Sequence, residues 1–245
     1  MPPPAKVQAG TAETLVTPPR VLPSDSNGRS VWPANYLHDG VVALGNERGI
    51  VCSGTLIAAT AVLTAAHCRH ATWALVVQAD GRRQRIGVRG FAVPPNRAVD
   101  AAVATLSSPA PVTPYRLRNA ADDLAPDESV RIVGFGSTDA RGNGAGTRRW
   151  ADVATDGWGC SERDALKAGC TPSLDLLLRS RDGADTCFGD SGGPVLELRE
   201  GRPRVLAVTS RGVRDATETC GAGGVYVRVD RIRSWLDIQL SNHRK

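Results

Sequence analysis

Short β-branched runs separated by turn residues dominate the sequence from Val41 onward. The first are VVAL at 41–44 and GIVCSGTLIAATAVLTAA, which starts at Gly49. β-Branched side chains favour strands, and turn pairs such as Asp80-Gly81 lie between the runs. The pattern predicts an all-β barrel or sandwich. Further strands are expected at 73–78, 84–93, 101–106, 129–135, 174–180, 194–198, 205–209 and 224–229.

Only the C-terminal end has the 3.6-residue periodicity of a helix. We expect a helix over 231–240, capped by Asp230, with one apolar face formed by Ile232, Trp235, Leu236 and Leu240. Residues 1–28 are rich in proline, alanine and threonine and are expected to be a pro-segment or a flexible arm. The proline-rich segment 109–126 is expected to connect two halves.

Length and composition exclude several classes of protein. The 245 residues, of which 41% are hydrophobic, suit one large domain or two small ones. No apolar run has the ~18 residues of a membrane span, and the N-terminus lacks the apolar stretch of a signal peptide. The net charge of +5 comes from dispersed arginines, and aromatic residues are only 4%. We therefore expect neither a membrane span nor a nucleic-acid partner.

Six cysteines indicate the compartment. They form no CxxC pair, and the four histidines supply no spaced zinc ligands, since Cys68 and His70 have no matching second pair. Disulfides explain them better than a metal, and six cysteines allow 15 pairings. Disulfides require an oxidising compartment, so we expect a secreted protein with no metal and no cofactor.

Three segments carry reactive side chains. The first is TAAHC at 64–68, the second is DAAVATL at 100–106, and the third is DTCFGDSGGP at 185–194. A serine hydroxyl becomes a nucleophile when a histidine removes its proton, and a carboxylate can orient that histidine. Taken singly, His67 has a structural explanation, and Asp100 could be a solvated acid at a strand end. Ser191 beside Asp190 between glycines is more specific.

Together these segments resemble the chymotrypsin- or trypsin-like serine peptidases, whose order of histidine, aspartate and serine they share over about 41–240. The resemblance implies two antiparallel Greek-key β-barrels, with the active site in the cleft between them and a C-terminal helix. It implies His67 as general base and acid, Asp100 as its orienting group and Ser191 as nucleophile. The amides of Gly189 and Ser191 are expected to form the oxyanion hole.

Asp185 occupies the position that forms the floor of the specificity pocket in trypsin-like members. A buried carboxylate needs a cation, so the resemblance implies cleavage after arginine or lysine. Thr186 is expected beside it, with walls from Ser210-Arg211-Gly212 and Gly224-Val225-Tyr226. Arg211 departs from the aromatic residue that is frequent in the family. We expect it to make the enzyme tolerate acidic or polar residues two to four positions before the cut.

The resemblance also implies the disulfides Cys52–Cys68 and Cys187–Cys220, which leaves Cys160 to pair with Cys170. The N-terminus is a second departure, because the family's Ile-Val-Gly-Gly start, whose ammonium pairs with the residue here numbered Asp190, is missing. We expect a precursor that is cut after Arg20 or Arg29, or another partner for Asp190, as in bacterial-type members. The expected division is an arm at 1–28 and a peptidase domain at 29–245, with barrels at about 30–115 and 125–230 and the helix at about 230–241.

Two other functions remain open. A binding protein on the same fold could hold anionic glycans or surfaces with its basic face, although no triad residue is missing here. A serine peptidase that cuts after another residue, such as glutamate, is the second, and the charge of Asp185 opposes it. The expected partners are protein or peptide substrates and protein inhibitors, and the expected state is a monomer.

Overall fold

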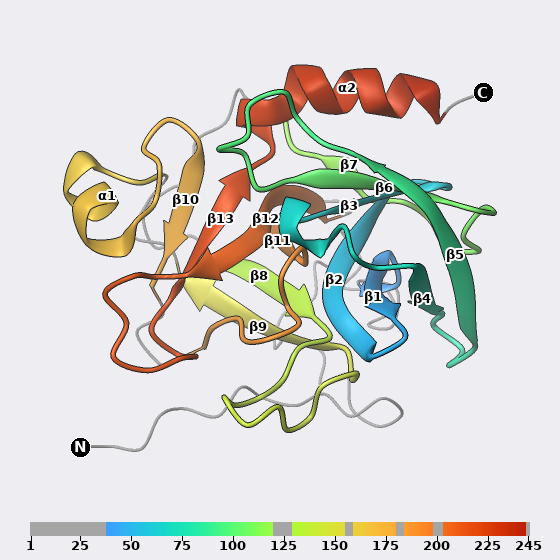
Figure 1. Ribbon diagram of the computed structural model, residues 1–245, viewed down its shortest axis with the longest axis horizontal. Coiled ribbons are helices and arrows are strands. Elements are labelled where there is room, and N and C mark those ends of the chain that lie inside the picture. Colours follow the sequence, from blue (N-terminus) through green and yellow to red (C-terminus); the bar gives the residue numbers. More distant parts are fainter. Residues whose placement is uncertain (1–37, 120–128, 155–158, 180–183, 198–202, 244–245) are drawn as a thin grey trace, which may run out of the picture.

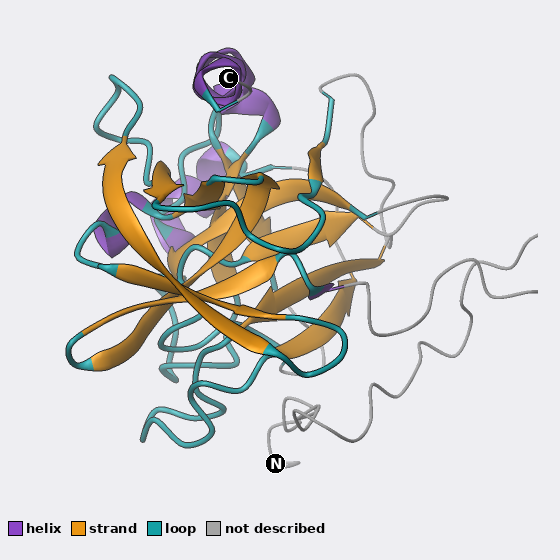
Figure 2. Ribbon diagram, turned by 90° about the vertical axis from the view of Figure 1, so that its right-hand side faces the viewer, coloured by secondary structure: helices purple, strands orange, loops and turns teal. Residues whose placement is uncertain are grey.

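A computed structural model of the chain describes residues 38–119, 129–154, 159–179, 184–197 and 203–243. Two sheets lie side by side, and the C-terminal helix α2 (Arg233–Asn242) lies at one end of the molecule, at the top in both views (Figure 1 and Figure 2). Strands make up most of the regular secondary structure in the described chain, as the β-branched runs predict. The position of the site follows from how the two sheets meet.

The N-terminal sheet closes into a barrel with the strand order β1-β2-β3-β6-β5-β4. Along β1, Val42 and Leu44 join an apolar cluster drawn from all six strands, while Val41 and Ala43 face the second sheet. Both faces of the strand are buried, which explains its continuous apolar run. The strands are β1 (Val41–Asn46), β2 (Gly49–Ala58), β3 (Ala61–Thr64), β4 (Trp73–Val77), β5 (Arg83–Ala92) and β6 (Ala102–Leu106).

The C-terminal sheet has the order β10-β13-β12-β11-β8-β9, and the short β7 pairs in parallel with β12. Its own apolar cluster includes Val130, Leu176, Val195 and Leu206. The strands are β7 (Arg116–Leu117), β8 (Ser129–Gly134), β9 (Arg149–Ala154), β10 (Asp175–Leu178), β11 (Pro194–Glu197), β12 (Arg204–Gly212) and β13 (Gly224–Arg228).

A third apolar cluster joins the two halves. Leu63 and Val103 of the barrel belong to it together with Leu196 and Val208 of the second sheet. The backbone adds a direct link, because the N–H of Ser53 in β2 donates to the carbonyl of Ser191 at 2.8 Å. This link brings the GDSGGP turn against the edge of the barrel, where the one-turn 3-10 helix η2 (Ala66–Cys68) carries His67.

The two-barrel, all-β fold expected from the resemblance is confirmed, including the C-terminal helix. That helix starts as a 3-10 turn, η3 (Asp230–Ile232), and continues as α2. Ile232 and Leu236 are buried in the cluster between the halves, as the periodicity predicts. The expected cap is wrong, because the Asp230 carboxylate accepts hydrogen bonds from Arg228 instead of an N–H of the helix.

The sequence analysis did not predict the helix α1 (Glu162–Ala168) or the strands β7 and β9, and it expected the segment that contains β7 to be a connection. The helix α1 contradicts the expectation that only the C-terminus is helical. Its signals are plain in retrospect: Ser161 and Asp164 form a capping box, and Gly169 ends the helix with φ at 75°. Strand β9 was missed because its sequence, RWADVA, has no long β-branched run.

Two expected segments lie partly or wholly outside the described residues. The N-terminal arm at 1–28 does so entirely, and the connection at 109–126 does so from residue 120. In the part of the chain that the structure describes, no helix combines the length and the apolar character that crossing a membrane would require.

Candidate active site

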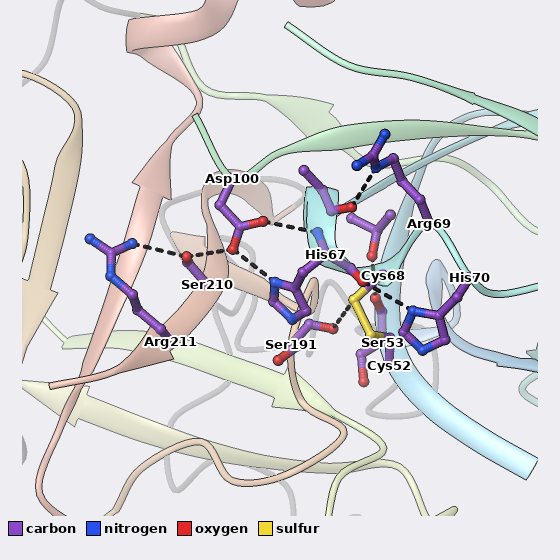
Figure 3. Close-up of polar contacts among 12 residues, drawn as sticks. Cys52, Ser53, His67, Cys68, Arg69, His70, Asp100, Ser191, Ser210 and Arg211 are labelled. Atoms are coloured by element: carbon purple, nitrogen blue, oxygen red, sulfur yellow. Dashed lines mark hydrogen bonds and ion pairs between the residues drawn. A yellow bond between two sulfur atoms is a disulfide. The ribbon is translucent and has the colours of Figure 1, made fainter. Parts of the chain in front are cut away.

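His67 and Asp100 are joined by two hydrogen bonds at the edge of the barrel (Figure 3). The backbone N–H of His67 donates to Asp100 Oδ1 at 3.1 Å, and ring Nδ1 lies 2.9 Å from Asp100 Oδ2. An ionised carboxylate only accepts, so Nδ1 carries the proton and Nε2 is left as an acceptor. The imidazole is thereby held in the tautomer that a general base needs.

Asp100 accepts a third hydrogen bond, from the Ser210 hydroxyl of β12, at 2.6 Å. Burial by itself would raise the pKa of Asp100, but the hydrogen bonds from His67 and Ser210 outweigh burial and hold that pKa below its usual range. Asp100 therefore stays ionised under the conditions in which His67 acts as a base. The carboxylate belongs to the barrel and Ser210 belongs to the second sheet, so the network spans both halves.

Ser191 lies beside the imidazole of His67 on the turn that precedes β11 (Figure 3). Gly192, the next residue, has φ at 82°, and a Cβ there would overlap Thr64 and the Ser53 carbonyl. Only glycine lets the turn approach the barrel this closely. Among the described residues, Ser191 Oγ has no hydrogen-bond partner, as is frequent for catalytic pairs before substrate closes them.

Two backbone N–H groups of the same turn are free. Among the hydrogen bonds of the described chain, none uses the N–H of Gly189 or of Ser191 as a donor. The Gly189 carbonyl, in contrast, accepts from Ser53 Oγ at 2.8 Å, and Gly189 has φ at 92°. Free amides of this kind on one turn are the groups that an oxyanion hole requires.

Asp185 is buried against a pocket of about 300 Å³. Its carboxylate accepts from the N–H groups of Thr186, Gly221 and Gly223 at 2.7, 3.1 and 3.0 Å, and no cation contacts it within the described chain. Burial raises its pKa, and these hydrogen bonds only partly oppose the rise. A cationic group entering the pocket would stabilise the charged form.

The pocket is built differently from the sequence expectation. Of the expected residues, Asp185 and Gly212 line it, whereas Thr186, Ser210, Arg211 and Gly224 are not among its described lining residues. Its other walls come from the loop that connects β12 to β13, and the sequence analysis did not single out this loop. The lining residues of the loop are Val213, Ala216, Thr217, Glu218, Thr219, Ala222 and Gly223.

Arg211 turns toward the protein. Its guanidinium donates to Ser210 Oγ at 3.1 Å, to the Gly169 carbonyl at 2.8 Å and to Asp175 Oδ2 at 2.9 Å. Sequence reasoning missed Asp175, although a single acid inside the apolar strand β10 was the available signal. The expected tolerance of acidic or polar residues before the cut stays a prediction, but the charge of Arg211 already has an anionic partner in Asp175.

Asp190, the residue before the nucleophile, is partly buried and forms no ion pair among the described residues. It accepts from the Gly136 N–H at 2.7 Å and from the Cys187 N–H at 2.9 Å. Burial raises its pKa to about 6, which the two hydrogen bonds and the charge of Arg149 only partly oppose. Side chains at Gly134 or Gly136 would overlap this carboxylate, so the glycines create its site.

The structure contains three disulfides, and they are the pairs expected from the resemblance. Cys52–Cys68 fixes η2 to β2, Cys160–Cys170 closes the loop that carries α1, and Cys187–Cys220 joins the nucleophile segment to the pocket loop. One described group gathers metal-type ligands, namely Cys52, His67 and Cys68. Both of its sulfurs belong to a disulfide, so neither is a thiolate ligand.

Comparison with known proteins gives a consistent result. A family model described as "Trypsin" matches residues 31–236. Human "Serine protease 56" is 33% identical over 219 residues, which are 78% of this chain and 35% of that protein, so the chain spans about a third of its length. "Chymotrypsin-like elastase family member 1" of Macaca fascicularis is 29% identical over 249 residues, which cover 91% of each chain.

The solved structure of neuropsin, a serine protease expressed in the limbic system of mouse brain, has the same fold. It superposes with a TM-score of 0.66 at 25% identity and covers 84% of this chain and 96% of that chain.

Proposed function

The chain belongs to the trypsin family of serine endopeptidases, and we propose that it hydrolyses peptide bonds after arginine or lysine. The catalytic residues of this proposal are Ser191, His67 and Asp100. One observation carries it: a tautomer-fixed histidine lies next to a serine on a glycine turn with two free amides, close to a buried, cation-free Asp185. The alternative of a binding protein gives no reason for this combination.

The proposed chemistry has two half-reactions. His67 Nε2 takes the proton of Ser191 as Oγ attacks the scissile carbonyl carbon, and then gives that proton to the leaving amine. Water, activated by the same nitrogen, hydrolyses the acyl-enzyme and restores the serine. Asp100 stays ionised throughout and stabilises the imidazolium that forms in each half-reaction, consistent with the hydrogen bonds that hold its pKa low.

The carbonyl oxygen becomes negatively charged during each attack. We assign its stabilisation to the N–H groups of Gly189 and Ser191, because both are free among the described hydrogen bonds and both belong to the turn. Loss of one such donor reduces turnover by about 10²- to 10³-fold.

The pocket accounts for the proposed specificity. A substrate arginine or lysine would bring a cation to Asp185, whose buried carboxylate has only neutral donors around it. Glu218 on the pocket wall adds a second negative charge. A glutamate side chain would meet two carboxylates here, which argues against the acidic specificity considered from sequence.

Activation is the part of the proposal that depends on Asp190. A partly buried carboxylate without an ion pair can accept the ammonium of a new N-terminus, and cleavage after Arg20 or Arg29 would create one. The pro-segment would then end at the cleaved arginine, and the peptidase domain would begin at Val21 or Ser30, close to the expected boundary between 1–28 and 29–245. Both cleavage points lie outside the described residues.

The remaining assignments follow from the family and the cysteines. Three disulfides suit an oxidising compartment, so we assign the protein to the secreted fraction. The assigned partners are protein substrates, and inhibitors that occupy the same cleft, and the assigned state is a monomer. That the chain is a bacterial-type member of the family stays a prediction.

A panel of single-residue chromogenic amides tests the proposal. Arginine, lysine, phenylalanine, alanine and glutamate amides are offered to protein cleaved before Val21 or before Ser30, beside Ser191→Ala as control. We expect hydrolysis of the arginine and lysine amides alone, and none by the variant. Preferred cleavage of the glutamate or alanine amide would refute the specificity, and activity of the Ser191→Ala variant would refute the nucleophile.

A further inference from the structure

Behind the catalytic aspartate, an ion pair connects two strands of the second sheet. Arg211 of β12 and Asp175 of β10 meet at 2.9 Å, and the Asp175 side chain is only 2% exposed while that of Arg211 is 41% exposed. Neither residue touches the pocket of Asp185. The guanidinium instead donates to the hydroxyl of Ser210, and the same hydroxyl donates to Asp100 (Figure 3).

The Ser210 hydroxyl has a single proton, and its two contacts determine where that proton points. Arg211 Nη1 can only donate, so Ser210 Oγ accepts at 3.1 Å. The proton must then go to Asp100 Oδ2, 2.6 Å away. The guanidinium therefore excludes the alternative in which the hydroxyl turns its proton away from Asp100 and leaves that oxygen with one donor fewer.

Asp175 in turn fixes the guanidinium. Its Oδ2 accepts from Arg211 and from the Thr171 N–H at 2.9 Å, and its Oδ1 has no partner among the described residues. Burial raises the pKa of Asp175, with Arg211 opposing the rise and Asp100 adding to it. The carboxylate is thus close enough to sense the charge of Asp100, and Arg211 is the cation between the two.

We propose that Arg211 and Asp175 are positioning residues for catalysis, which direct the Ser210 hydroxyl onto Asp100 and set the charge balance around His67. The proposal rests on the proposed peptidase function. Among the described residues, the charged and titratable groups that face this chain of contacts are Asp100 and His67 from the barrel, Arg211 and Asp175 from the sheet, and Arg214, whose guanidinium packs against Gly169. Arg69 and His70, which follow His67, bond the backbone carbonyls of Ala66 and His67 and are unchanged in the variants below.

The test measures kcat, KM and their pH dependence on a single-residue arginine amide, in processed protein. Such a substrate has no residue upstream of the arginine, so a role of Arg211 in binding those residues cannot contribute. An active-site phosphonate titrates the competent fraction, so that partial unfolding does not count as lost activity. Arg233→Gln is the matched control, because Arg233 also forms a half-exposed ion pair, with Asp237, away from Ser210.

The two charge-removing variants should act in opposite directions. Arg211→Gln removes a cation, which makes protonation of the imidazole easier. We therefore expect the midpoint of the acidic limb of the kcat/KM profile to move to higher pH by about half a pH unit. Asp175→Asn removes an anion, and the same limb should fall by a similar amount. We expect kcat of Arg211→Gln to decrease roughly 10-fold with little change in KM. Arg211→Lys keeps the charge and should leave the limb in place, while restoring only part of kcat.

Several results would overturn the inference. One is that the acidic limb of the kcat/KM profile moves in the same direction in both variants, and another is that it stays at its wild-type position. A third is that the variants change KM while kcat is unaffected. An effect as large in Arg233→Gln would likewise assign the loss to general stability. Failure of the proposed function is distinguishable, because the wild type itself would then neither hydrolyse the amide nor react with the phosphonate.

Discussion

The barrel formed by β1 to β6 and the sheet formed by β8 to β13 bury different kinds of side chain. The inside of the barrel is aliphatic, with Val42, Leu44, Leu56 and Val62 among its members. The second sheet buries charges as well, at Arg131, Asp175, Asp185, Glu197 and Arg228. A buried charge requires a partner. Each buried charged side chain of the second sheet therefore either pairs within the fold or is suited to bind a ligand of opposite charge.

This difference separates the tasks of the two halves. The barrel contributes two reactive groups at its edge, His67 and Asp100, and both are already satisfied by one another. The sheet contributes Asp185 and Asp190, and neither forms an ion pair within the described chain. In the proposed function, the barrel supplies a preformed base, whereas specificity and activation depend on cations that bind to the two aspartates of the sheet.

The largest effect should follow from breaking the preformed base. Asp100→Asn keeps the shape of the side chain but can place an amide N–H opposite His67 Nδ1 in place of a carboxylate oxygen. The imidazole is then no longer held in the tautomer with the proton on Nδ1. We expect kcat on an arginine amide to fall about 10⁴-fold. Asp80→Asn, in the exposed hairpin of the same barrel, is the control and should retain full activity. A loss below 10-fold for Asp100→Asn would contradict the assigned role.

The next effect concerns the negative charge of Asp185 in the pocket. Asp185→Ser removes the partner of a bound arginine, and we expect kcat/KM for the arginine amide to fall roughly 10²- to 10³-fold. Reaction with a neutral fluorophosphonate, which does not use the pocket charge, should continue at a similar rate. If both reactions decline together, Asp185 supports the fold instead of specificity.

Asp190 offers a prediction about stability and pH. Its pKa is raised to about 6 in the folded chain from an ordinary value of 3.8, so between these values the folded state binds more protons than the unfolded state. Stability then falls as pH rises through this window, by about 2 to 3 kcal/mol for this group. Asp39, also raised to about 6, has the same sign.

Denaturant unfolding of the uncleaved chain at pH 4 and pH 7 measures this contribution to stability. We expect Asp190→Asn to remove about half of the loss between the two pH values, and Asp39 to account for the remainder. N-terminal processing should reduce the loss in the wild type, since an ammonium would pair with Asp190. Equal losses in the uncleaved wild type and in Asp190→Asn would show that the carboxylate is not desolvated.

The smallest effect concerns the cap of α1. Ser161→Ala removes the hydroxyl that accepts from the Asp164 N–H, and we expect about 1 kcal/mol lower stability with unchanged kcat. Thermal unfolding measures the loss, and Ser241→Ala, in the exposed last turn of α2, is the matched control. A change in kcat would mean that α1 is coupled to the site through Cys160–Cys170.

The sequence was sufficient for most of the strands and for the three reactive segments, because local patterns encode them. The strand runs and the TAAHC and GDSGGP strings depend on neighbouring residues alone. The pocket walls at 213–223 were not foreseen, since their course depends on the Cys187–Cys220 link and the loop between its ends. The Arg211–Asp175 pair joins β12 to β10, two strands that are not adjacent in the sheet, so no local pattern announces it.

The central claim is that Ser191, activated by His67, acts next to a pocket for a cation. A benzamidine-bearing phosphonate tests the nucleophile and the pocket at once when processed protein is labelled and mapped by mass spectrometry. We predict one adduct, on Ser191, that forms much faster than with an uncharged phosphonate and does not form in His67→Ala. Labelling at another residue, or equal rates for the charged and uncharged reagents, would contradict the account.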